Sequence, residues 1–276
     1  MNLAPSTRCR SRNEPLKPPR PTTVVETLSF RGGRKARLVL MDKRAAQTER
    51  EAHFGFEYGV VSEAIGRERS AIAYYRHEIR RTSYFKAHFN LAHMLARRGR
   101  LSEAIVHYRR AARLSPRGAL RSDVLNNLGT AYSRKGLTAK AITAFQQSSR
   151  ENPRNASPCV NVALQFLLRG DLKRGRRWLD RAHRLRTLDA ETDSWVAYAL
   201  IKYDLGVPKG VRMLERFLVR NPKDWRAVAD LAVGYMKLGD HAKAKSLARS
   251  AKRRAPKDRE VGEQVARVLR NCTMVD

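Results

Sequence analysis

Six glycines recur at nearly constant spacing along this chain of 276 residues, and successive ones lie 33 to 37 residues apart. They are Gly66, Gly99, Gly136, Gly170, Gly206 and Gly239. A fixed period of this length is the sequence signature of a repeat architecture, in which each unit is one small supersecondary structure. The chain is therefore predicted to form an array of units that each contact mainly their neighbours.

Residues 121–155 show what one unit contains. Two apolar stripes at helical spacing lie on either side of Gly136, and Pro153 ends the second. The stripes consist of Leu125, Leu128, Gly129 and Tyr132, and then of Ala141, Ile142, Ala144 and Phe145. Helices this short cannot bury such stripes alone. Each unit is therefore predicted to be a pair of helices joined at a left-handed glycine.

The order of residue types in this unit resembles the tetratricopeptide repeat, whose period is about 34 residues. The same order recurs upstream, with Leu91, Ala92, Gly99, Ala104, Tyr108 and Pro116, and downstream, with Leu231, Ala232, Gly239, Ala244 and Pro256. The resemblance covers roughly residues 52–258. It implies an all-α, right-handed superhelical solenoid of about six units, at about 52–84, 85–118, 122–155, 156–189, 192–224 and 225–258.

The segments outside the array differ in kind. Residues 1–51 form a basic extension rich in proline and arginine, whose first 21 residues are expected to be disordered. Two β-prone runs around Gly32 and Gly33 predict a hairpin or docking segment. Residues 259–276 are predicted to be a capping helix and tail. Within the array, Ala119–Arg121 is interpreted as a short insertion between units, and Gly206 as the turn glycine of the fifth unit.

The net charge of +31 exceeds anything that such an array needs in order to fold. It indicates an anionic partner, with a compositional bias of the source genome as the alternative. The predicted second helices carry most of the cations and are expected to bind a polyanion through Lys173, Arg174, Arg177, Arg181, Arg184, Arg249, Lys252 and Arg253. Few aromatic residues interleave with them, so RNA or DNA would be bound through phosphates.

In the family that the chain resembles, the first helix of each unit lines a concave groove. Asn90, Asn127 and Asn161 occupy the same place in three successive units, and this series ends at Ala197 and Asp230. Such a row of amides can bond the backbone of an extended peptide, as in relatives with asparagine ladders. The alternative is that each amide bonds a neighbouring helix. We expect three cations beside this row: Lys86, Arg97 and Arg134. They would favour an acidic or C-terminal carboxylate motif in the ligand.

Motifs for catalysis are missing from the sequence. There is no glycine-rich phosphate loop, nucleophile elbow or metal-ligand spacing, so no enzyme, metal or cofactor is predicted. His88 and His93 are expected to face the same groove as plain polar residues. Cys9, Cys159 and Cys272 lie far apart, which predicts free thiols in a reducing compartment.

The sequence predicts a non-enzymatic scaffold that binds a protein partner in its groove and belongs to a larger complex. The alternative is a basic component of a ribonucleoprotein or other polyanionic assembly, and a third hypothesis is a regulatory subunit that presents an enzyme to an anionic membrane. No transmembrane segment or secretory signal is predicted. The expected location is the cytoplasm, or an organelle interior if the N-terminus is a transit peptide.

Overall fold

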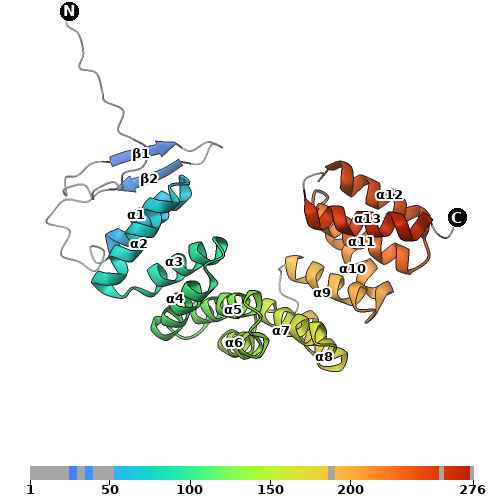
Figure 1. Ribbon diagram of the computed structural model, residues 1–276, viewed down its shortest axis with the longest axis horizontal. Coiled ribbons are helices and arrows are strands. Elements are labelled where there is room, and N and C mark those ends of the chain that lie inside the picture. Colours follow the sequence, from blue (N-terminus) through green and yellow to red (C-terminus); the bar gives the residue numbers. More distant parts are fainter. Residues whose placement is uncertain (1–24, 30–34, 40–52, 186–189, 255–257, 274–276) are drawn as a thin grey trace, which may run out of the picture. The chain divides into compact units, whose positions relative to one another are not determined.

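The computed structural model describes residues 25–29, 35–39, 53–185, 190–254 and 258–273 (Figure 1). The chain divides into two compact units, residues 1–115 and 116–276, which are described separately. Apart from one pair of strands, all the regular structure in the described residues is helical, which confirms the all-α class.

The first unit begins with two antiparallel strands, β1 (Val25–Ser29) and β2 (Lys35–Val39). Val25 lies opposite Val39 and Ser29 opposite Lys35, so the strands flank the Gly32–Gly33 segment. The predicted disorder of residues 1–21 concerns residues outside the described part of the chain. Docking of the segment around Gly32 and Gly33 on a partner stays a prediction.

Four helices complete the first unit: α1 (Phe54–Ala64), α2 (Glu68–Thr82), α3 (Phe85–Arg97) and α4 (Leu101–Leu114). Each packs against the next along the chain. Their seam is formed by apolar stripes of α2, α3 and α4, against which α1 places Gly55, Gly59 and Ser62. Its largest fully buried side chains include Tyr75, Leu91, Leu95 and Tyr108. Burial of these stripes, rather than helix propensity, stabilises helices of this length.

The second unit contains nine helices in its described residues, and each packs against its successor. They are α5 (Ala119–Arg134), α6 (Thr138–Glu151), α7 (Ser157–Leu168), α8 (Leu172–Arg184), α9 (Ala190–Lys202), α10 (Val207–Arg220), α11 (Trp225–Lys237), α12 (His241–Arg254) and α13 (Arg259–Thr273). Helix α11 also contacts α9 and α13. Helix α13 buries Val261, Val265 and Val268 in a cluster shared with α11 and α12, as expected of a capping helix.

Five of the six recurring glycines end a first helix in the left-handed conformation. Their φ angles lie between +76° and +82°, for Gly66, Gly99, Gly136, Gly170 and Gly239. The N–H after each glycine bonds back to the helix, as when Asp171 donates to the carbonyl of Phe166 at 2.9 Å. This is the Schellman closure that glycine makes accessible, so the interpretation of these five turns is confirmed.

The sixth glycine, Gly206, has a different place from the one predicted. In the fifth repeat Asp204 takes the left-handed conformation, with φ of +55°, and Leu205 N–H donates to the carbonyl of Leu200 at 3.0 Å. Gly206 lies two residues further on and precedes α10. Aspartate tolerates this conformation better than most residues. Two residues, Leu205 and Gly206, then precede α10, whereas Asp171 alone separates Gly170 from α8.

The register of α9 is therefore shifted by two residues from the predicted one. Asp204 corresponds to Gly170, so Ala197 corresponds to Ala163, and both are fully buried. Trp195 of α9 therefore corresponds to Asn161 of α7 in the repeat register, and the prediction that Ala197 corresponds to Asn161 is wrong.

The interpretation of Ala119–Arg121 as an insertion between units is also wrong. These residues form the first turn of α5, which begins after Gly118 at φ of +96°. The carbonyl of Gly118 accepts the Ser122 N–H at 2.9 Å, and its own N–H donates to Glu151 Oε2 at 3.0 Å. Ala119–Arg121 therefore lengthen α5 by about one turn and do not lengthen the loop between α4 and α5.

Candidate functional site: the first-helix face

The three asparagines lie at the edge of the buried seam. Asn90 on α3, Asn127 on α5 and Asn161 on α7 are half-buried. Each is followed directly by a buried residue of the seam, namely Leu91, Leu128 and Val162. Each amide therefore stands beside the core at a fixed point of its repeat. Asn127 and Asn161 share the second unit, whereas Asn90 belongs to the first.

Each amide donates one hydrogen bond within the part of the chain that the structure describes. Asn161 Nδ2 donates to Asn126 Oδ1 on α5 at 2.9 Å, and Asn90 Nδ2 donates to Tyr75 Oη on α2 at 3.1 Å. Asn127 Nδ2 instead donates to the Asp123 carbonyl of its own helix at 2.9 Å. A primary amide has a second N–H and a carbonyl with two acceptor positions, so each group retains capacity for a ligand.

The three predicted groove cations do not form one cluster. Lys86 and Arg97 are exposed at opposite ends of α3, about three helical turns apart. Lys86 Nζ lies 6.0 Å from the centre of the Tyr84 ring, and an Arg97 Nη1 lies 3.9 Å from Glu63 Oε1. Arg134 is exposed in the last turn of α5, in the second unit. A single carboxylate cannot therefore contact both Lys86 and Arg97.

The sequence analysis missed a group on α9, which we call the α9 ledge: Trp195, Tyr198 and Lys202. The rings of Trp195 and Tyr198 meet edge to face with centroids 5.8 Å apart, and Trp195 is 44% exposed. Lys202 Nζ donates to Tyr198 Oη at 2.6 Å. With Gly206 as the turn residue, Trp195 and Tyr198 would correspond to Leu125 and Leu128 of the third unit, which are buried. The available signal was Asp204, a residue type that adopts the left-handed conformation.

The cations predicted to bind a polyanion lie on the second helices α8 and α12, and all of them are exposed. On α8, Arg174 pairs with Asp171 and lies 4.7 Å from the Phe166 ring, and Arg181 lies 5.1 Å from the Trp178 ring. The other three on that helix are Lys173, Arg177 and Arg184. On α12, Arg249, Lys252 and Arg253 lie in its second half.

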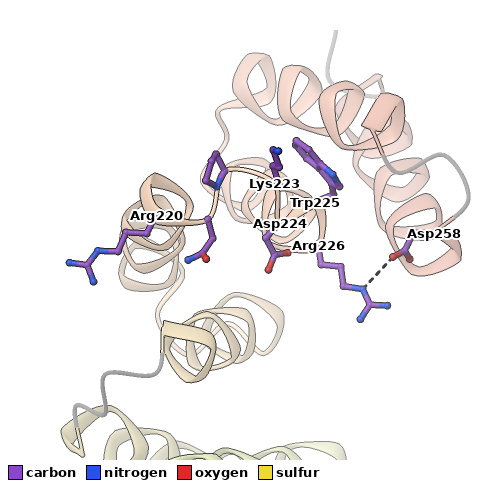
Figure 2. A pocket seen from close by; sticks show the side chains of 8 residues that line it. Arg220, Lys223, Asp224, Trp225, Arg226 and Asp258 are labelled. Atoms are coloured by element: carbon purple, nitrogen blue, oxygen red, sulfur yellow. Dashed lines mark hydrogen bonds and ion pairs between the residues drawn. The ribbon is translucent and has the colours of Figure 1, made fainter. Parts of the chain in front are cut away.

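An open depression of about 710 Å³ lies beside the start of α11 (Figure 2). Its acidic groups are both engaged: Asp224 accepts the Ala227 N–H at 3.0 Å, and Asp258 lies 3.3 Å from Arg226 Nε. Lys223 and Arg220 also line it. In the described residues, no three histidine, cysteine, aspartate or glutamate side chains gather as metal ligands would.

His88 and His93 do not share a surface, so that expectation is wrong. His93 is exposed, whereas His88 is buried and its Nδ1 lies 3.0 Å from Nδ1 of His107 on α4. Burial, with the nearby His107 and Arg110, lowers the pKa of His88 to about 4. Cys159 and Cys272 are buried and form no disulfide in the described residues, and burial raises the pKa of Cys159. Cys9 lies outside the described residues.

Within the parts of the chain that the structure describes, no helix has the length and apolarity needed to span a membrane. The tandem helix pairs, closed by left-handed turns and packed against their successors within each unit, define a helical-repeat protein. Residues 83–150 and 206–259 match models of the tetratricopeptide repeat. The chain is a tetratricopeptide repeat protein, as the order of its residue types predicted.

No curated protein matches the chain significantly. Among solved structures, a chain of the APC/C hetero-tetramer Cut9–Hcn1 is 16% identical, with a TM-score of 0.66 over 82% of this chain and 44% of that one. PilF of Pseudomonas aeruginosa is 19% identical, with a TM-score of 0.61 over 79% and 98%. A tetratricopeptide repeat protein from Parabacteroides merdae is 16% identical, with a TM-score of 0.58 over 82% and 93%.

These identities support a shared fold and nothing finer. The chain spans less than half the length of the matched Cut9–Hcn1 chain. Arrays of this class are scaffolds, whose stacked repeats present extended surfaces to other proteins.

Proposed function

We propose that this protein is a non-enzymatic scaffold, which binds an extended segment of a partner protein along the first helices of its repeats. The observation that carries the proposal is a half-buried amide one residue before a buried core residue on three of these first helices: Asn127 and Asn161 in the second unit, and Asn90 in the first. An amide can donate to and accept from a peptide backbone whatever the side chains of that peptide are. The row therefore suits an extended segment rather than a folded surface.

The test is capture of a partner on the immobilised full chain, followed by measurement of its affinity. Replacement of both Asn127 and Asn161 by alanine should weaken binding about tenfold, because two amides lose their bonds to the ligand. Gln147→Ala is the matched control, since Gln147 is an exposed amide on the second helix α6. Circular dichroism should show unchanged helicity in both variants. An affinity equal to that of the unsubstituted protein would exclude the amide row as the binding surface.

A second candidate function is that of a basic component in a polyanionic assembly, such as a ribonucleoprotein. It is favoured by α8, on which five predicted phosphate-binding cations are exposed. Of these five, Arg174 alone forms an ion pair with a carboxylate in the described residues. Solvated helix faces usually alternate in sign, and this one does not. A complex held in this way would be sensitive to nuclease and would weaken steeply as salt rises, whereas a groove-bound protein partner would survive both.

A further inference from the structure

Trp195, which is exposed, and Tyr198, which is half-buried, form an aromatic pair, and Trp195 stands where preceding repeats carry asparagine. Their counterparts one repeat earlier are Asn161 and Leu164, as the turn at Asp204 requires. Val196 and Ala197 are buried and hold α9 in the seam, while Trp195 stays 44% exposed. The contact with Tyr198, at 89° between ring planes, fixes the indole without covering it.

Lys202 adds a positive charge to the same face, about two turns after Trp195. Its amino group donates to Tyr198 Oη at 2.6 Å and lies 5.1 Å from the centre of that ring. The same amino group lies 5.6 Å from the centre of the Tyr203 ring, and the Asp230 carboxylate is close enough to interact with it electrostatically. The charge is exposed and is held beside the aromatic pair.

Another exposed apolar side chain lies on the neighbouring first helix, α7. Ser157 Oγ on α7 lies 3.4 Å from Thr192 Oγ1 on α9, so these two first helices are neighbours. Leu168 corresponds to Lys202 by the same repeat register, and it is 65% exposed. Leu168 therefore adds an exposed apolar side chain to α7 at the level of Lys202.

We propose that Trp195 and Tyr198 bind one bulky apolar side chain of the partner segment, and that Lys202 binds an acidic side chain next to it. The inference rests on the proposed scaffold function and adds the chemistry of the ligand. Charge complementarity with Lys202 selects the acidic group, and the exposed rings select the apolar one. Tryptophan and tyrosine are also the residues most often found to dominate binding energy at interfaces.

The probe is a short, labelled, acetylated and amidated peptide with one phenylalanine between runs of glutamate. Its binding anywhere on the full chain is measured by fluorescence anisotropy. Binding at the ledge is measured by Trp195 emission, in a variant whose other two tryptophans, Trp178 and Trp225, are replaced by phenylalanine. We expect emission to shift to shorter wavelength, and Trp195→Ala to weaken binding at least about tenfold. Val219→Ala, which removes an 83% exposed side chain from the second helix α10, should change affinity less than about twofold.

Comparison peptides identify the source of any binding. Replacement of phenylalanine by serine, or of glutamate by lysine, should abolish the emission shift, and a free C-terminus should not be required. Binding that Trp195→Ala leaves intact but the double asparagine variant weakens would overturn the ledge and keep the scaffold. No anisotropy change up to about 1 mM peptide would also overturn the ledge, while the capture experiment tests the scaffold independently. If the sole-tryptophan variant fails to fold, the difference in emission between the unsubstituted protein and Trp195→Phe gives the same reading.

Discussion

Gly129 on α5 lies against the Phe145 ring of α6, and this contact leaves no space for a side chain. A Cβ at Gly129 would lie 2.6 Å from the ring carbons Cδ1 and Cε1. Gly129→Ala should therefore lower the free energy of unfolding by about 1–3 kcal/mol, measured by urea denaturation. Gly262→Ala in α13 is the control, because nothing lies within 4 Å of its Cβ position, and it should raise stability by about 0.5–1 kcal/mol. Equal stability of Gly129→Ala and the unsubstituted protein would contradict this tight packing.

The His88–His107 pair makes stability depend on pH. Burial is the main cause that lowers the pKa of His88 to about 4, and the nearby Arg110 acts in the same direction. Burial and Arg76 also lower the pKa of His107, where Glu103 opposes them. Unfolded histidine titrates near 6.5, so the unfolded chain binds more protons between these values and stability rises with pH. The contribution of His88 is complete above about pH 6.5 and is lost as pH falls towards 4.

We expect the free energy of unfolding to fall by about 1–3 kcal/mol across that range. Denaturation at several pH values measures it. His88→Gln should flatten this dependence, and His93→Gln, which changes an exposed histidine on the same helix, should leave it unchanged. An unaltered pH profile in His88→Gln would show that the pair does not titrate in this way.

At the scale of elements, Lys237 of α11 joins two repeats. Its amino group donates to the Ile201 and Lys202 carbonyls at the end of α9, at 2.8 and 3.3 Å, and to Asp204 Oδ1 at 2.6 Å. A cation at a helix C-terminus stabilises the last carbonyls, and here it also holds the left-handed Asp204. The unusual turn of the fifth repeat is thus supported by the sixth.

Lys237→Ala should destabilise the second unit by about 1–3 kcal/mol, because three acceptors lose their donor. Urea denaturation measures the change. Lys223→Ala, an exposed lysine in the loop before α11, should change stability by less than about 0.5 kcal/mol. Hydrogen exchange of the last turn of α9 should accelerate in Lys237→Ala alone; equal exchange in both variants would remove the link between these helices.

At the scale of the whole molecule, the net charge of +31 raises the question whether polyanion binding is local. Reversal of Lys173, Arg177 and Arg184 to glutamate should lower the salt concentration that elutes the protein from heparin, because exposed cations on one helix are lost together. The matched control reverses Arg109, Arg113 and Lys140, which are exposed on α4 and α6, with the same change in net charge. Equal shifts in the two variants would mean that total charge, and not α8, governs retention.

Most of the fold follows from local patterns in the chain. Apolar stripes and left-handed glycines predict the helix pairs, because a helix forms and ends according to residues within a few positions of each other. That is why five turns and the capping helix lie where the residue types place them. The amides of Asn127 and Asn161 could likewise be located from the repeat period alone.

Tertiary contacts decided what the period cannot encode. The left-handed turn lies at Asp204 instead of Gly206, where Lys237 reaches it from 33 residues away, and this shift exposes Trp195. His88 is buried because His107 of another helix faces it, and Asn161 bonds Asn126 across two repeats. Such contacts join residues that lie far apart in the chain, so no local pattern specifies them, and the packed seam selects among turns that are otherwise close in energy.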